Sequence, residues 1–131
     1  MGTWGSGNFA NDSAQNYMND FEDQLVQQIE DILADEERYA LEEEGEGVLM
    51  PTVEILSVLH EHRFIGLPER ETILRWKEQY LAAFDDQIDG FEPKAGYKES
   101  RRAVIEATFL KLEAQAWDYA EKQKWFLKPD E

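Results

Sequence analysis

The chain has 131 residues, of which 42% are hydrophobic and 32% are charged, and its formal net charge is −16 at pH 7. This length and composition fit one folded domain, and the absence of cysteine excludes disulfides, thiolate metal sites and cysteine nucleophiles. No apolar run has the length of a signal sequence or a membrane span, so a cytoplasmic location without a membrane partner is expected.

An irregular arm is predicted over residues 1–11. Three glycines within the first seven residues discourage regular structure, yet Trp4 and Phe9 are large apolar side chains that need cover. We therefore expect the arm to be ordered and to lie on the helices, with Trp4 largely buried.

The first helix is predicted over residues 12–44. Apolar side chains recur there at intervals of three and four, and no glycine or proline interrupts the stretch. With Asp12 as the N-cap, Gln15 occupies the third helical position and completes a capping box. A bend near Asp23 or Asp35 would leave this pattern unchanged.

Three more helices are predicted, over residues 50–63, 68–85 and 100–124. A proline marks the first turn of the helices over residues 50–63 and 68–85. Residues 86–99, which contain glycines and a proline, are predicted to form a loop. The last helix is apolar on more than one side and is expected to pack against several others. The predicted fold is all-α: a single domain, residues 1–131, built as a bundle of about four helices with the arm packed on it.

The negative charge is concentrated in one half of the chain. Residues 1–62 hold 15 acidic residues and one basic residue, Arg38, whereas residues 63–131 hold 14 acidic and 12 basic residues. A field of this sign repels nucleic-acid phosphates and attracts basic partners by steering. We expect a basic protein partner and no nucleic acid, although solubility alone also explains the acidity.

Four residues are weak candidates for a site. His60 and His62 form a His-Glu-His segment, but residues two apart on a helix point in nearly opposite directions. Glu54 and Glu106 stand within apolar helical stretches, where facing carboxylates act as an acid/base pair or hold a metal. The alternatives without a functional role are that both histidines lie at the surface and that Glu106 pairs with Arg102 one helical turn away.

No catalytic, cofactor or metal motif is complete. Asp85, Asp89 and Gly90 fall at the first, fifth and sixth positions of a calcium loop, but Gly96 stands where a bidentate glutamate is needed. No nucleophile elbow, P-loop or dinucleotide fingerprint is present. We therefore expect no cofactor and no metal.

The N-terminal residues Met1-Gly2-Thr3-Trp4-Gly5, then Phe9, then Asn11-Asp12 and Ala14, resemble the start of the bacterial domain-of-unknown-function 4259 family. The resemblance implies a small bacterial protein with a shared N-terminal arrangement, and it implies no catalytic residue. Trp4, Phe9, Asn11 and Asp12 would be signature positions. Structural roles suffice for them, since Asn11 or Asp12 caps a helix and the two rings anchor the arm.

Two functions are weighed for this sequence. The first is a non-enzymatic protein-binding module, of which an immunity-type inhibitor that covers a basic toxin or nuclease is one version. The alternative is a small-molecule or metal-dependent enzyme that uses Glu54, His60, His62 and Glu106. A homo-oligomer held by the apolar surplus of the last helix is compatible with both.

Overall fold

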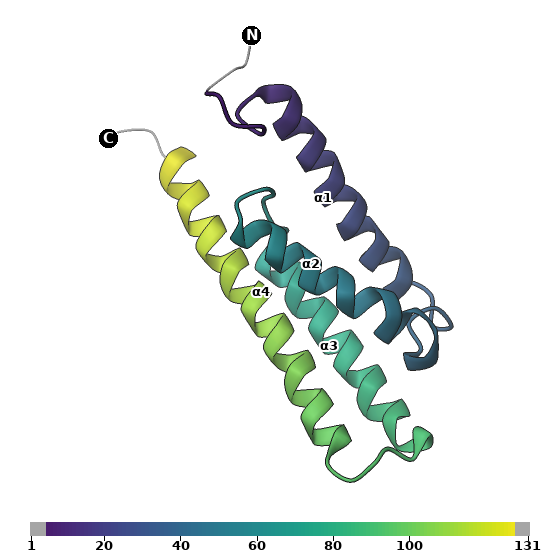
Figure 1. Ribbon diagram of the computed structural model, residues 1–131. Coiled ribbons are helices and arrows are strands. Elements are labelled where there is room, and N and C mark those ends of the chain that lie inside the picture. The colour runs from purple at the N-terminus through teal and green to yellow at the C-terminus, as the bar shows by residue number, and fades with distance from the viewer. Residues whose placement is uncertain (1–4, 128–131) are drawn as a thin grey trace.

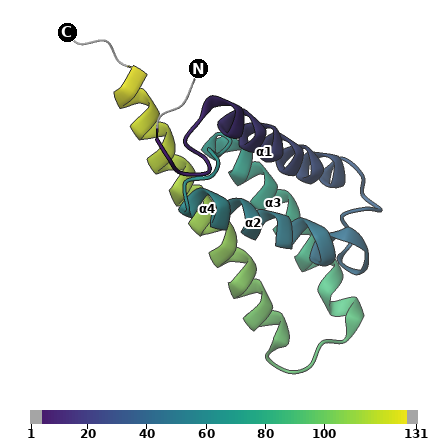
Figure 2. The same ribbon diagram turned by 45° about the horizontal axis from the view of Figure 1, so that its top comes forward.

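The structure, a computed structural model, describes residues 5–127 and is built from helices. Its elements are α1 (Asp12–Leu33), a segment of wide π-type turns (Leu41–Leu49), α2 (Met50–Glu61), α3 (Arg70–Gln87), a 3-10 turn (Ile88–Phe91) and α4 (Tyr97–Leu127). Figures 1 and 2 show α1 on one side of the molecule and α4 on the other, with α2 and α3 between them. The prediction of a single all-α domain is confirmed.

The core lies where α3 meets α4 and α2. Aromatic side chains at intervals of four along α3, which are Trp76, Tyr80 and Phe84, are fully buried. Phe109 of α4 is fully buried as well, and α4 packs against both α2 and α3. This single side of α4 enters the core. The opposite side leaves Leu110 58% exposed and Trp117 50% exposed, so α4 is less enclosed than its composition predicts.

The first helix ends at Leu33, well short of the predicted residue 44. Asp35 starts a separate turn there, because its carboxylate accepts hydrogen bonds from the backbone N–H groups of Glu37, at 3.0 Å, and Arg38. Such local bonds compete with helix continuation. The side-chain amide of Gln79 on α3 donates to the Leu33 carbonyl at 2.7 Å and satisfies one helix-end acceptor.

The segment between α1 and α2 folds back onto α3. The Leu41 backbone N–H donates to Gln87 at 2.9 Å, and Glu43 breaks the helical backbone with φ −100° and ψ −116°. A Cβ at Gly45 would lie 2.6 Å from the Tyr39 carbonyl oxygen and 3.1 Å from the Tyr80 ring. Only glycine therefore permits this close approach to α3.

Other boundaries differ by a few residues from those predicted. The second helix ends at Glu61, before the predicted residue 63, and α3 occupies residues 70–87 in place of 68–85. The predicted loop 86–99 is largely structured, because it contains the 3-10 turn, with Ile88 buried, and the first turn of α4.

The arm is described from Gly5 onward and touches the rest of the protein through Phe9. The Phe9 ring lies 4.7 Å from the Phe64 ring, measured between centroids, although Phe9 stays 42% exposed. Trp4 lies outside the described residues, so its burial stays a prediction. Asn11 is the N-cap, since its side chain accepts from the Ala14 N–H at 2.8 Å. The capping box predicted from Asp12 and Gln15 is therefore wrong, and the Gln15 amide donates to Asn19 instead.

Candidate functional site

Exposed acidic residues lie along α1 and along the turns between α1 and α2. We call this region the acidic surface and define it by eight exposed residues: Asp20, Asp23, Asp31, Asp35, Glu36, Glu37, Glu42 and Glu43. None of the eight forms an ion pair with any residue that the structure describes. Their charges are therefore left largely to solvent ions, although Asp35 also accepts the backbone N–H groups of Glu37 and Arg38 and interacts at longer range with the Arg38 guanidinium.

Other acidic residues of the same half serve the fold. Glu30 accepts from Arg75 at 2.5 Å and from the indole N–H of Trp76, which ties α1 to α3. Glu46 accepts from Arg101 at 2.7 and 2.8 Å and from the Tyr80 hydroxyl at 2.5 Å. Burial raises the pKa of the Glu46 carboxyl, but these hydrogen bonds outweigh burial and hold that pKa below its usual value.

Exposed aromatic rings accompany the acidic surface. The apolar stripe predicted for the first helix is buried only in part, because Tyr17 is 69% exposed and Phe21 is 37% exposed. Both rings lie within one helical turn of Asp20. The N-terminal part of α1 therefore presents apolar rings and carboxylates together.

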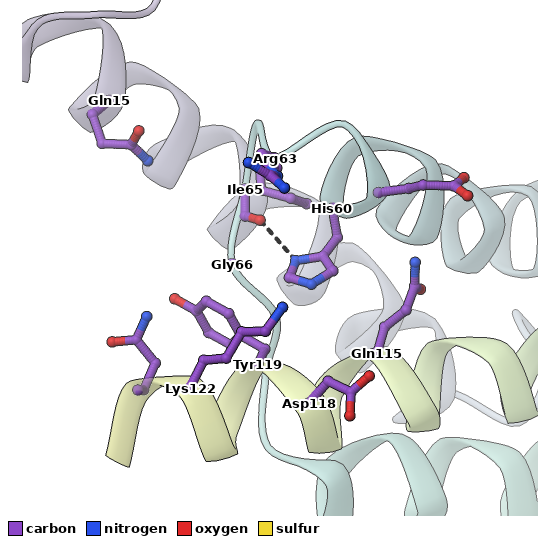
Figure 3. A pocket seen from close by; sticks show the side chains of 11 residues that line it. Gln15, His60, Arg63, Ile65, Gly66, Gln115, Asp118, Tyr119 and Lys122 are labelled. Carbon is purple, nitrogen blue, oxygen red and sulfur yellow. Dashed lines mark hydrogen bonds between the residues drawn. The ribbon is translucent and has the colours of Figure 1, made fainter. Parts of the chain in front are cut away.

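A polar hollow of about 660 Å³ lies at the corner where α2 ends and the chain turns toward α3. We call it the corner hollow. Figure 3 shows its walls, which come from the start of α1, the end of α2, residues 63–66 and the C-terminal half of α4. Volumes of this size are typical of small-molecule sites.

The end of α2 places Arg63 at this hollow in an unusual backbone conformation. The Phe64 N–H donates to the Leu59 carbonyl and the Arg63 N–H to the His60 carbonyl, both at 2.9 Å, which is a Schellman helix end. Arg63 has φ +65°, and this position is commonly occupied by glycine because a Cβ is disfavoured there.

His60 faces the hollow in a fixed orientation. Its Nδ1 lies 2.9 Å from the Ile65 carbonyl oxygen. Because a carbonyl only accepts, Nδ1 carries the proton and Nε2 is left for other partners. The Tyr119 ring packs edge-on against the imidazole at 5.3 Å between centroids.

Gly66 allows Tyr119 to lie against the chain, since a Cβ at Gly66 would be 2.5 Å from the Tyr119 Oη. Burial raises the pKa of the Tyr119 hydroxyl, and the nearby Glu22 carboxylate adds to this shift. Burial also raises the pKa of Glu22, as does Asp23, while a hydrogen bond from the Gly66 backbone opposes the shift. These contacts hold the wall of the hollow in place.

The four weak candidates do not share a site. His60 lines the corner hollow, while Glu54 is exposed beside Pro51 and Arg101 at a separate shallow hollow. Glu106 pairs with Arg102, as the one-turn spacing predicts. His62 is exposed and stacks on Phe64 at 6.2 Å between centroids.

The residues that resemble a calcium loop have other partners. Asp85 accepts from Arg102 at 2.8 Å, and Asp89 accepts from Lys98 at 3.0 Å. The part of the chain that the structure describes brings together no group of three or more His, Asp or Glu side chains with the geometry of a metal site. Nor does any described helix have the length and apolar character needed to cross a membrane.

Sequence reasoning missed Arg63, Tyr119 and Lys122 at the corner hollow. Arg63 carries one usable signal, because a helix that ends without glycine before the Gly66-Leu67-Pro68 stretch needs another residue in the left-handed conformation. The residues of α4 carry none, since they reach this corner only through the packing of α4 on α2.

The model of the family described as Domain of unknown function (DUF4259) matches residues 2–95. The match spans more than half of the chain, so the chain belongs to this family, as the N-terminal resemblance predicts. No curated protein and no solved structure matches the chain. The matched range stops just before α4, although α4 contributes Ile105, Phe109 and Leu112 to the core.

Proposed function

We propose that this DUF4259 protein is a non-enzymatic protein-binding module, and that its acidic surface binds a basic surface of a partner protein. The observation that carries the proposal is a set of eight exposed carboxylates that form no ion pair with the described residues. An inhibitor that covers a basic toxin or nuclease is the version that best fits a field of this strength.

Basic residues of the chain pair with carboxylates outside the acidic surface. Arg38, the one basic residue of the first half, pairs with Glu44 at 2.5 Å. Arg75, Arg101 and Lys111 of the second half reach across to Glu30, Glu46 and Glu61. The acidic surface is left without compensation. Such a field accelerates association with a cationic partner and makes the association rate sensitive to salt.

The exposed rings of Tyr17 and Phe21 can supply binding affinity that exposed charges do not. Exposed charges at the edge of an interface mainly set the association rate, whereas buried aromatic anchors supply most of the affinity. Tyr17 lies one helical turn from both Asp20 and Phe21, so a partner that docks there covers both kinds of group. This arrangement favours a folded basic protein over a simple polycation.

The test uses two variants with the same net charge. In the first, Asp20, Asp23, Glu36 and Glu37 are replaced by their amides. The second variant is the matched control, in which four exposed acids of the other half of the chain are replaced by their amides. These acids, which form no ion pair with a described residue, are Glu71, Glu78, Asp86 and Glu99.

Immobilised wild-type protein is used to capture partners from a lysate of the source organism at low salt, and the captured protein is then purified. Its association rate should fall on the order of tenfold with the first variant and stay near the wild-type value with the control. Equal effects of both variants, or capture of nothing at low salt, would contradict the proposal.

The outer side of α4 supports a second contact, with another copy of this chain. Ala103, Ala107, Leu110, Ala114 and Trp117 follow each other at alternating intervals of four and three and are all exposed. Antiparallel pairing about Leu110, the midpoint of this row, places Leu110 against Leu110, Ala107 against Ala114 and Ala103 against Trp117 of the other copy, so the large indole meets a small side chain.

The charge of α4 permits this pairing. It holds six basic and five acidic residues, so it is the part of a strongly acidic chain that least repels its own copy. Light scattering should then give a dimer for the wild type and a monomer for Leu110→Lys. Ile55→Lys, which changes a comparably exposed residue of α2, serves as the control and should remain dimeric. A monomeric wild type would refute the pairing.

A further inference from the structure

We infer that the corner hollow binds a small anion of the phosphate type, held by Arg63 and Lys122 with help from His60. This inference does not depend on the acidic surface, because none of the eight residues that define that surface lines the hollow. It rests on three observations: free cations, a costly backbone conformation and a set of hydrogen-bonding groups directed to one space.

The hollow gathers two cations that form no ion pair with a described residue. Among the described residues, every Lys and Arg forms an ion pair except Arg63, Lys94 and Lys122. Two of these three line the same hollow. In a chain with a net charge of −16, unpaired cations that converge on one cavity indicate an anion that is supplied from outside.

Arg63 occupies a position where its side chain carries a structural cost. Its φ of +65° places it in the left-handed region, which glycine adopts without penalty. The hydrogen bonds that fix this helix end come from the backbone and would form equally well with glycine. Strain of this kind is common at functional sites, and the guanidinium is the group that glycine would remove.

His60 and Lys122 add further hydrogen-bonding groups at the hollow. Figure 3 shows the amino end of Lys122 directed toward the His60 ring, while the Tyr119 ring lines the hollow with its hydroxyl pointing away from His60. Since His60 Nδ1 is bound to the Ile65 carbonyl, Nε2 is the ring atom free to meet a ligand, and a protonated phosphate oxygen can donate to it. Guanidinium and ammonium groups are the usual protein ligands of phosphate.

Two carboxylates also line the hollow and oppose an anion. Glu61 is partly neutralised by Lys111, whose Nζ lies 3.5 Å from it. Asp118 forms no ion pair with a described residue. A phosphate-type ligand must therefore bind despite Asp118, and this predicts that removing the Asp118 charge tightens binding while removing the Lys122 charge weakens it.

The test is calorimetric titration with inorganic phosphate at constant ionic strength, with chloride as the compensating anion. The wild type should bind saturably, and Lys122→Gln and Arg63→Gly should each weaken binding about tenfold. Asp118→Asn should strengthen it several-fold. Lys94→Gln, which removes the third unpaired cation at a distance from the hollow, is the matched control and should bind as the wild type does.

A thermal melt separates binding from folding. Arg63→Gly should melt at or above the wild-type temperature, because glycine relieves the left-handed backbone, while its phosphate affinity falls. The inference is overturned if the wild type shows no saturable binding at millimolar phosphate. It is overturned equally if Lys94→Gln weakens binding as much as Lys122→Gln, or if Asp118→Asn does not strengthen it.

Discussion

The two outer helices of this protein contribute in different ways. On α4, Ile105, Phe109 and Leu112 are fully buried, and its six basic residues nearly balance five acidic ones. On α1, the buried residues are Met18 and three of the last five residues of the helix, and Leu25 and Val26 are partly buried. The outer side of α1 carries Tyr17, Phe21 and several carboxylates exposed to solvent. One side of the molecule holds the fold together, whereas the other presents an unsatisfied charge.

Emptying the core at α4 should have the largest effect on stability. Phe109→Ala removes a fully buried ring and should lower the free energy of unfolding by about 3 to 5 kcal/mol, measured by urea denaturation. The matched substitution at Leu110, which points outward, should change it by less than about 1 kcal/mol. Similar losses at both positions would mean that α4 is enclosed on both sides.

Gly45 tests the segment that joins the two sides. Gly45→Ala forces a Cβ against the Tyr39 carbonyl and the Tyr80 ring, and overpacking of this kind costs about 1 to 3 kcal/mol. Gly47→Ala is the control, because a Cβ there meets nothing within 4 Å. Thermal melts of the two variants should differ, and equal melting temperatures would contradict the close approach to α3.

Glu46 provides a pH test of an acid that serves the fold. Its pKa is lowered in the folded state, so its contribution to stability is present above the unfolded pKa and is lost as pH falls through the folded pKa. Glu46→Gln should cost about 1 to 3 kcal/mol at neutral pH, and the difference from wild type should shrink as the pH falls below about 4.3, the ordinary pKa of a glutamate, because the unfolded chain then binds protons that the folded carboxylate does not. Urea titrations at both pH values measure this, and a difference that grows in acid would contradict the assignment.

The smallest effect on stability is expected on the outer side of α1. Tyr17→Ala removes a ring that is 69% exposed and should change the free energy of unfolding by no more than about 0.5 kcal/mol. Binding of the captured partner should nevertheless weaken, by more than tenfold if Tyr17 is an anchor. A loss of stability well above that figure would place Tyr17 in the fold instead.

The sequence predicts the helices well where periodicity decides them and poorly where distant contacts do. The apolar spacing of Ile73, Trp76, Tyr80 and Phe84 identifies α3 directly. The end of α1 depends on Asp35 and on Gln79, a residue of another helix, so a pattern read along the chain runs past it. Propensity and period carry no information about such tertiary hydrogen bonds.

The candidate site shows the same division. The acidic half is visible in the sequence, because charge is a property of composition. The corner hollow is not, because it joins Gln15 to residues near His60 and near Tyr119 that are far apart along the chain. The His-Glu-His segment makes His60 a candidate in the sequence, but the contacts that orient its ring are with the Ile65 carbonyl and the Tyr119 ring.

The most direct test of the account compares the unfolding free energies, at low salt, of the wild type and of the variant neutralised at Asp20, Asp23, Glu36 and Glu37. If the acidic surface serves binding and not folding, this variant should be at least as stable as the wild type, with a gain of about 0.2 to 0.5 kcal/mol for each repulsion that is relieved. A loss of more than about 1 kcal/mol would show that these carboxylates hold the fold together, which contradicts the account.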